Sequence, residues 1–395
     1  DLRMNYDGIM SSRIQQVQPS GIRKFFDILE EMKDAISLGV GEPDFVTPWH
    51  IRDAGIYSLE KGFTKYTSNA GMAELRREIA AYQERRFRLH YDFASQIIVT
   101  VGGGSPHDCG KGIGIAATHE GDLYQYAGIE TLTNPLPPIV AVNTTAGTAS
   151  EVTRHCVLTN TETKVKFVIV SWRNLPSVSI NDPLLMIGKP AALTAATGMD
   201  ALTHAIEAYI GRSTTKLTRT MSEEAATLIV RSLYKAYQDG GDMDARRDML
   251  RAAYCAGVSF PRSYVGYVHG VAHSLGGQYG VPHGLANAVI LPYFLDAYGS
   301  ACHKKLGRLA RIAGVAPQSA DDRDASEAFI RWIREMNAAM GIPDHIQEIR
   351  ISDIPEMAHH AAQESNPLYP VPVLMDEREL AAMYLNLMPR KEQNA

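Results

Sequence analysis

The sequence predicts an α/β nucleotide-binding part with an incomplete, partly parallel sheet, followed by an all-helical domain and preceded by a helix-rich segment. Short β-branched runs flanked by Gly, Asn and Pro are concentrated in residues 97–190, as in the buried strands of a mainly parallel sheet. Residues 191–395 instead show helical periodicity with several Ala-rich stretches. Residues 1–96 are polar and mostly helical in pattern. These observations predict three domains, with boundaries near residues 96 and 190.

Composition and charge argue against several classes of protein. A chain of 395 residues can hold two or three domains, and 45% hydrophobic with 21% charged residues is typical of soluble proteins. The net charge of −5, without a long basic run, argues against nucleic acid or an anionic membrane as the main partner. No apolar stretch approaches the ~20 residues that cross a bilayer, and the first residues lack the apolar core of a secretory signal. Four scattered cysteines are expected to be reduced thiols of a cytoplasmic protein: Cys109, Cys156, Cys255 and Cys302.

The region 97–190 combines predicted strands with two loops that suit a nucleotide. The strands are expected at 97–101, 139–142 and 167–170. A glycine cluster at 102–112 follows the first strand, and a polar loop at 143–151 follows the second. Glycine lets backbone N–H groups approach a phosphate, and α/β folds bind nucleotides at the carboxyl ends of parallel strands. The cluster matches neither the G-x-G-x-x-G fingerprint nor a Walker loop, so a plain tight turn remains the alternative.

Four side chains in the helical region have the spacing of metal ligands: Asp200, His204, His269 and His283. Asp200 and His204 lie four residues apart in a helix-forming run, so that both face the same side of the helix. His269 and His273 repeat that spacing, and His283 follows a Gly- and Pro-containing stretch that can turn the chain back. One carboxylate with three imidazoles suits Fe²⁺ or Zn²⁺, and Mn²⁺ also tolerates such ligands. The alternative is a set of core histidines with satisfied hydrogen bonds.

Four longer motifs connect these features to a known family. They are Gly-Gly-Gly-Ser-Pro-His-Asp-Cys-Gly-Lys-Gly-Ile-Gly (102–114), Val-Asn-Thr-Thr-Ala-Gly-Thr-Ala-Ser-Glu-Val-Thr-Arg (142–154), Tyr-Val-His-Gly-Val-Ala-His-Ser-Leu-Gly-Gly (267–277) and Val-Pro-His-Gly-Leu-Ala-Asn-Ala (281–288). From about residue 97 to the C-terminus, the sequence resembles the iron-containing (group III) alcohol dehydrogenases. The resemblance implies reversible hydride transfer between a small primary alcohol or diol and NAD(P), with the metal as Lewis acid, in a protein that often forms homo-oligomers.

The resemblance also implies a role for individual residues. The metal ligands of the family fall on Asp200, His204, His269 and His283. His273 matches a histidine near the nicotinamide that assists proton movement, although a core-packing histidine is the open alternative. The pyrophosphate loop and the other cofactor-contacting positions fall on Gly103, Gly104, Ser105, Thr144, Thr145, Thr148 and Lys166.

Residues 1–96 do not show these motifs. Gly-Val-Gly-Glu-Pro-Asp-Phe (39–45) and Tyr-Thr-Ser-Asn-Ala-Gly-Met-Ala-Glu-Leu-Arg (66–76) resemble the start of class I/II pyridoxal-phosphate aminotransferases, so the chain reads as a chimera. Transamination needs a Schiff-base lysine, and the family's lysine motif does not follow residue 102. The exchange would also remove early strands of the nucleotide-binding sheet. The alternatives to an active dehydrogenase are therefore an impaired chimera that binds metal but not cofactor productively and, less favoured, a pyridoxal-phosphate protein.

Overall fold

The computed structural model describes Tyr57 and residues 73–88, 90, 92–93, 100–137, 139–160, 163 and 165–389. Contacts divide the chain into two units, Asp1–Tyr66 and Thr67–Ala395, and the sheets and the helices from Ala73 onwards belong to the second. The aminotransferase-like motif at 39–45 and most of the one at 66–76 lie outside the described residues. Within the described part of the chain, no helix combines the length and apolar character needed to span a bilayer.

The described strands form two small sheets. The strands are β1 (Thr100–Gly102), β2 (Gly128–Ile129), β3 (Val140–Asn143), β4 (His155–Asn160), β5 (Val165–Val170) and β6 (Val178–Asn181). The first sheet has the order β1-β3-β6 and is parallel throughout. The second has the order β2-β5-β4, with β2 parallel and β4 antiparallel to β5. The predicted partly parallel sheet is confirmed, and the β4–β5 hairpin is an antiparallel addition that the sequence analysis missed.

One face of the first sheet is apolar and open to solvent. The register pairs Val101 with Val142 and Val142 with Ile180, and it pairs Val140 with Val178, so all five side chains share one face. Four of them, all except the half-buried Val142, are between 43% and 50% exposed. The opposite face carries the buried residues of the strands. The sheet is therefore covered on one side only in the described structure.

Helices make up most of the remaining chain. The α-helices are α4 (Ala73–Phe87), α5 (Gly104–Thr118), α6 (Ala191–Ile210), α7 (Lys216–Gln238), α8 (Met243–Ser263), α9 (Tyr267–Tyr279), α10 (His283–Tyr298), α11 (Ser300–Ala313), α12 (Asp322–Ala339), α13 (Ile354–Ser365) and α14 (Glu377–Leu387). The 3₁₀-helices are η1 (Leu123–Tyr126), η2 (Ser150–Val152), η3 (Trp172–Asn174), η4 (Pro183–Met186) and η5 (Ile351–Asp353). The predicted helical character is confirmed from Ala191 to Leu387, while the domain boundaries near 96 and 190 stay predictions.

The helical part has one large hydrophobic core that fixes the positions of α6, α9 and α10. Helix α6 is rich in alanine, and sixteen of its residues are buried, because it packs between α7, α8 and α10. Helix α9 ends at Tyr279 and is followed by Gly280, whose φ of 71° is a left-handed conformation that favours glycine. The chain then turns at Pro282 and begins α10 at His283. The predicted reversal of the chain before His283 is thus confirmed.

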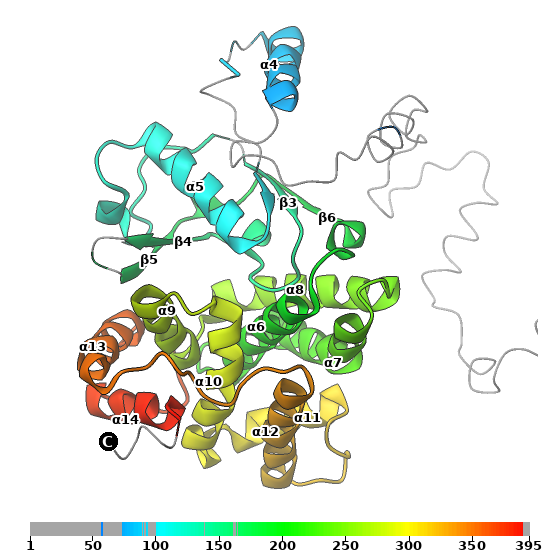
Figure 1. Cartoon of the computed structure of the whole chain (residues 1–395), viewed down its shortest axis with the longest axis vertical. Helices are drawn as coiled ribbons and strands as arrows, with labels where there is room; N and C mark the ends of the chain where they lie inside the picture. The colour runs from blue at the N-terminus through cyan, green and yellow to red at the C-terminus, as the bar shows by residue number, and fades with distance from the viewer. Residues whose placement is uncertain are drawn as a thin grey trace, which may run out of the picture. The chain divides into compact units, whose positions relative to one another are not determined.

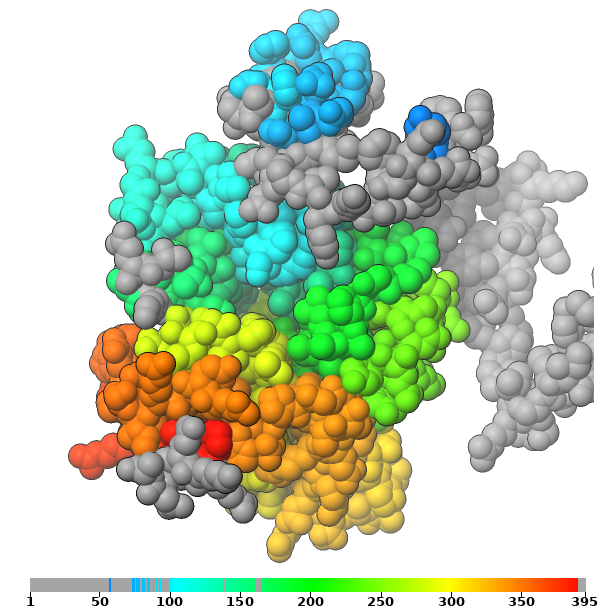
Figure 2. Space-filling model, in the orientation of Figure 1, coloured from blue at the N-terminus to red at the C-terminus, as the bar shows by residue number. Residues whose placement is uncertain are grey.

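The α/β part and the helical part meet along β5 and α9. Figure 1 shows α9 between the β4–β5 hairpin and α13, in agreement with the contacts among these elements. In Figure 2 the cyan and teal surface of the α/β part lies directly against the green and yellow surface of the helices. The start of α5, the hairpin and helices α9 and α13 together line one cavity. This arrangement positions the candidate site.

Candidate metal centre and cofactor cleft

Four side chains from three helices converge on one point. Asp200 and His204 come from α6, His269 from α9 and His283 from the first position of α10. One ligand atom from each lies within 4.8 Å of the other three. Asp200 Oδ1 is 3.5 Å from His283 Nε2, 3.9 Å from His269 Nε2 and 4.0 Å from His204 Nδ1. Ligand atoms around a tetrahedral ion with bonds of about 2.1 Å lie roughly 3.4 Å apart, so small adjustments suffice for coordination.

The buried polar atoms of this cluster lack ordinary partners. Asp200 Oδ2, His204 Nδ1 and His283 Nδ1 are buried and accept or donate no hydrogen bond in the described structure. Such atoms are costly unless something satisfies them. Burial lowers the pKa of His204 and of His269, which favours the neutral imidazoles whose lone pairs can bind a metal. A divalent cation fits this donor set, because it would bind the carboxylate and one ring nitrogen of each imidazole together.

Asn287 is a polar neighbour of the cluster that the sequence analysis missed. It is fully buried on α10, and its Nδ2 donates to Asp200 Oδ1 over 2.7 Å. The same nitrogen lies 3.2 Å from Nε2 of His269 and 3.2 Å from Nε2 of His283. Its place four residues after His283 was the available signal, since that spacing puts both on one helix face.

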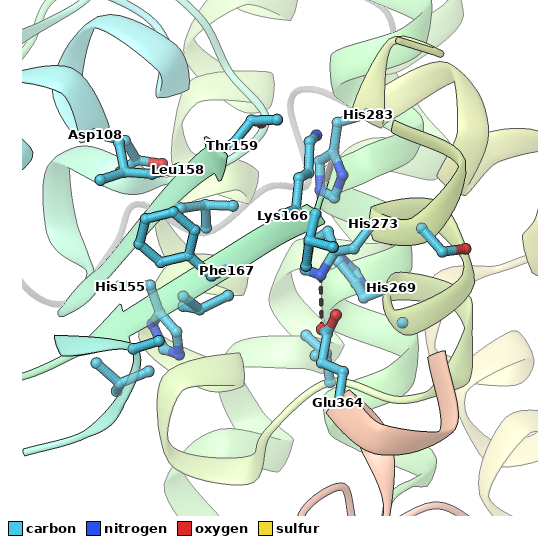
Figure 3. A pocket seen from close by; sticks show the side chains of 18 of the residues that line it. Asp108, His155, Leu158, Thr159, Lys166, Phe167, His269, His273, His283 and Glu364 are labelled. Atoms are coloured by element: carbon cyan, nitrogen blue, oxygen red, sulfur yellow. Dashed lines mark hydrogen bonds and ion pairs between the residues drawn. The ribbon is translucent and has the colours of Figure 1, made fainter. Parts of the chain in front are cut away.

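His273 faces the cavity and is held by a carboxylate that no sequence motif indicated. Its Nδ1 lies 2.7 Å from Glu364 Oε1, and the Tyr369 hydroxyl donates to the same oxygen over 2.7 Å. Figure 3 shows the His273–Glu364 bond as a dashed line. The His273 ring also stacks on His283, with centroids 5.2 Å apart. The structure thus places His273 on the cavity wall beside the proposed ligands, and not within the hydrophobic core.

The cavity has a volume of about 720 Å³, which lies within the usual range of roughly 300–1,000 Å³ for small-molecule and cofactor sites. Its lining includes five of the predicted site positions outside the metal cluster: Gly104, Ser105, Thr148, Lys166 and His273. Burial is the main cause that lowers the pKa of the Lys166 amine. Figure 3 shows Lys166 on the hairpin reaching towards His283 and His273 on the facing helices.

The two predicted cofactor loops lie in direct contact at the start of α5. A Cβ atom on Gly103 would lie 2.6 Å from Thr145 Oγ1, and one on Gly104 would lie 2.8 Å from Thr148 Oγ1. Helix α5 has no side-chain cap, so its first N–H groups are available to a ligand. Thr144 N donates to Gly102 O over 2.9 Å, which holds the second loop against the first. Gly103, Thr144 and Thr145 form this contact and are not part of the cavity wall.

Comparisons with known proteins agree with this geometry. Residues 57–183 match the family model described as iron-containing alcohol dehydrogenase, and residues 194–388 match the C-terminal model of the Fe-containing alcohol dehydrogenase family. The 1,3-propanediol dehydrogenase of Klebsiella pneumoniae is 59% identical over 290 residues, which cover 73% of this chain and 75% of that protein. The enzyme of the same name from Citrobacter freundii is 52% identical over 337 residues, covering 85% and 84%.

Solved structures show the same relationship. The crystal structure of a 1,3-propanediol oxidoreductase superposes with a TM-score of 0.70 at 55% identity, covering 81% of this chain and 82% of that one. An alcohol dehydrogenase from Oenococcus oeni gives a TM-score of 0.71 at 40% identity, covering 85% and 88%. These likenesses show that the chain is similar to 1,3-propanediol dehydrogenases over most of its length.

The family match also bears on the N-terminal part of the chain. It begins at residue 57 and so overlaps residues 57–96 of the segment that the sequence analysis assigns to a different family. The resemblance of residues 1–96 to an aminotransferase stays a prediction. The family models and the high identity to relatives covered over most of their length make one conclusion plain: the chain belongs to the iron-containing alcohol dehydrogenase family.

Proposed function

We propose that this protein is a metal-dependent alcohol dehydrogenase that transfers hydride reversibly between a small primary alcohol or diol and NAD(P). The observation that carries the proposal is that three of the four converging side chains, His204, His269 and His283, line the same cavity as the glycine loop at the start of α5. A metal site and a nucleotide loop facing one cavity provide what hydride transfer from an alcohol requires. Membership of the family supports the same reaction.

The four converging side chains are the proposed metal ligands: Asp200, His204, His269 and His283. The ligand set suits Fe²⁺, and Zn²⁺ or Mn²⁺ are the alternatives. A bound divalent ion supplies Lewis acidity, which lowers the pKa of an alcohol oxygen and polarises an aldehyde carbonyl. The protein contributes the fixed geometry, because each ligand lies on a helix of one packed core.

The proposed cofactor positions are the two loops at the start of α5 together with one lysine of the hairpin: Gly103, Gly104, Ser105, Thr144, Thr145, Thr148 and Lys166. The uncapped start of α5 offers N–H groups and partial positive charge to a pyrophosphate. Lys166 extends over Gly276 of α9, where a Cβ atom would lie 2.8 Å from its Nζ. A sulfoacetaldehyde reductase of Bifidobacterium kashiwanohense, solved in complex with NAD⁺, shares 27% identity with a TM-score of 0.65 and supports a nicotinamide cofactor.

His273 is the proposed catalytic residue for proton movement. Its Nδ1–H donates to Glu364, which leaves Nε2 as the ring nitrogen able to accept a proton from the alcohol. Glu364 is 22% exposed at its side chain, so it can pass the proton onward to water. The Tyr369 hydroxyl holds the same carboxylate oxygen and keeps the pair in place.

Small diols and aldehydes are the favoured substrates. Besides the two 1,3-propanediol dehydrogenases, the lactaldehyde reductase of Escherichia coli is 38% identical over 271 residues, covering 68% of this chain and 70% of that protein. Each of these names refers to a short, polar carbon chain. The proposal further includes a cytoplasmic homo-oligomer with three domains: an aminotransferase-like segment (1–96), a partial nucleotide-binding domain (97–190) and a helical metal-binding domain (191–395).

A second candidate function rests on the exposed face of the first sheet. Val101, Val140, Val178 and Ile180 present their side chains to solvent on the sheet that carries both cofactor loops. A sheet without full cover would hold those loops less firmly. On this reading the protein is an impaired chimera that binds metal through its helices but does not bind NAD(P) productively.

Two measurements on the full chain separate the candidates. After reconstitution with Fe²⁺ or Zn²⁺, a fluorescence titration with NADH and an assay of NADH formation from 1,3-propanediol and NAD⁺ should both give a saturable signal. His269→Ala should abolish metal retention and turnover, whereas His359→Ala, at a half-exposed histidine paired with Glu377, should change neither. Metal binding without NADH binding would favour the impaired chimera, and unchanged turnover in His269→Ala would overturn the ligand assignment.

A further inference from the structure

We propose that Glu207 is the positioning residue of the metal centre: it fixes the orientation and tautomer of His269 and ties the two ligand-bearing helices together. This inference rests on the proposed metal site. It assigns a role to a buried carboxylate that belongs neither to the ligand set nor to the cavity lining. The argument starts from where Glu207 lies on α6.

Glu207 continues the row of ligands along α6. It follows His204 by three residues and Asp200 by seven, and side chains at these spacings lie on one face of a helix. Glu207 is 4% exposed, and its neighbours in the row are buried to the same degree. One helix therefore supplies two ligands directly and reaches the third through the carboxylate of Glu207.

The contacts of Glu207 connect α6 to the beginning of α9. Its Oε2 lies 2.5 Å from His269 Nδ1, across 62 residues of sequence. Its Oε1 accepts the backbone N–H of Val268 over 2.9 Å. Helix α9 has Gly266 at its N-cap without a side-chain cap, so Glu207 supplies the acceptor that its first turn would otherwise lack.

Gly266 leaves room for this contact. Its φ of −137° is an ordinary extended value, so the backbone does not require glycine there. The available space does require glycine, because a Cβ atom on residue 266 would lie 2.6 Å from Glu207 Oε1. The absence of a side chain at Gly266 therefore allows the carboxylate to reach the turn.

Oε1 of Glu207 accepts from the backbone, and when the carboxyl group is ionised Oε2 accepts as well, which determines where His269 carries its proton. A neutral imidazole has a single N–H, and a contact of 2.5 Å with an ionised carboxylate requires that N–H to lie on Nδ1. The lone pair then lies on Nε2, the nitrogen that faces Asp200 Oδ1 at 3.9 Å. A carboxylate behind a ligating histidine orients the ring and raises its basicity as a ligand.

Replacing Glu207 by glutamine would break this arrangement with almost no change in the size of the side chain. An amide has one acceptor oxygen, and the backbone N–H of Val268 needs it. The amide nitrogen would then point at His269 Nδ1 and donate to it. The imidazole proton would have to move to Nε2, where it prevents coordination. Glu207→Gln thus tests the tautomer and not only the volume of the side chain.

The test compares variants of the full chain by titration with Co²⁺, whose visible absorption reports both affinity and the number of protein ligands. Glu207→Gln should weaken Co²⁺ binding by about 10–100-fold, the usual effect of removing such a partner, and should alter the visible band. The matched control is Glu223→Gln on α7. The Glu223 carboxylate accepts a hydrogen bond of 2.8 Å from the Tyr209 hydroxyl, and Glu223 does not belong to the ligand set. This control should bind Co²⁺ as the unaltered chain does.

A second variant covers the case in which Glu207→Gln fails to fold. Gly266→Ala keeps the carboxylate but displaces it from α9, and it should also weaken Co²⁺ binding with an altered band. Folding is checked by circular dichroism of the metal-free proteins. If either folded variant binds Co²⁺ within threefold of the unaltered chain and with the same band, or if Glu223→Gln has an equal effect, the positioning role is overturned. Failure of the unaltered chain to bind Co²⁺ would instead overturn the proposed metal site.

Discussion

The packing of α10 against α6 leads to a prediction about Gly284, the residue after His283. A Cβ atom at this position would lie 2.6 Å from the carbonyl oxygen of Ala196 and 2.9 Å from its carbonyl carbon, both backbone atoms of α6. Backbone atoms cannot rotate away as a flexible side chain can. Gly284→Ala therefore requires the start of α10 to move away from α6, and His283 moves with it.

The size of the effect follows from these distances. Non-bonded heavy atoms are comfortable at about 3.5–4.0 Å, so the helix must shift by roughly 1 Å. Overpacking of this kind costs about 1–3 kcal/mol of unfolding free energy, partly offset by up to about 1 kcal/mol of helix propensity gained from alanine. A metal site tolerates only about 0.2 Å in its ligand distances. We therefore expect a net loss of about 1–2 kcal/mol in stability and a larger loss in metal affinity.

The assay measures urea unfolding of the metal-free protein by circular dichroism, together with metal content after dialysis. The matched control is Gly114→Ala within α5, where a Cβ atom would meet its nearest neighbours only at 3.8–4.0 Å, an ordinary contact distance. That control should be neutral or slightly stabilising, by up to about 1 kcal/mol. Equal stability and full metal content in Gly284→Ala would refute the close contact between the two helices as the structure describes it.

Three further predictions concern the α/β part and the cavity. Lys111→Met should cost about 3–5 kcal/mol of unfolding free energy in a denaturant titration, because the fully buried Lys111 Nζ donates to backbone carbonyls between β3 and the start of β4 and pairs with Asp108. Without the amine, these buried acceptors lose their partner, and a cost below about 1 kcal/mol would contradict this. His273→Ala should lower kcat by about 10²–10⁴-fold with metal content unchanged, measured by steady-state kinetics and elemental analysis, and a change below threefold would argue for a packing role. Gly104→Ala should raise KM for NAD(P) by about tenfold, because its Cβ displaces Thr148, and an unchanged KM would show that this loop does not approach the cofactor.

Part of the proposed metal site could be predicted from the sequence, because local spacing relates two of its four ligands. Asp200 and His204, four residues apart on a predicted helix, converge as helix periodicity requires. The glycine cluster likewise indicated a helix start after a strand, and α5 begins at Gly104. In each case the relevant residues lie within a few positions of each other, so the sequence alone constrains how they face.

The supporting residues could not be found in the same way. Glu207 meets His269 across 62 residues, and Glu364 meets His273 across 91, so neither pair has a local pattern. The antiparallel pairing of β4 with β5 was also missed, because β-branched runs indicate strands but not the direction in which they pair. These features depend on tertiary packing, which one sequence does not determine by periodicity.

The open valine face of the first sheet matters for how this protein behaves at high concentration. Val140 and Val178 are 47% and 50% exposed, so each contributes little buried area to the fold. Exchanging them for threonine, which keeps β-branching, removes little packing while adding a hydroxyl that water can solvate. Val140 and Val178 are thus two positions where exchange for threonine should improve colloidal stability without a change to the cavity.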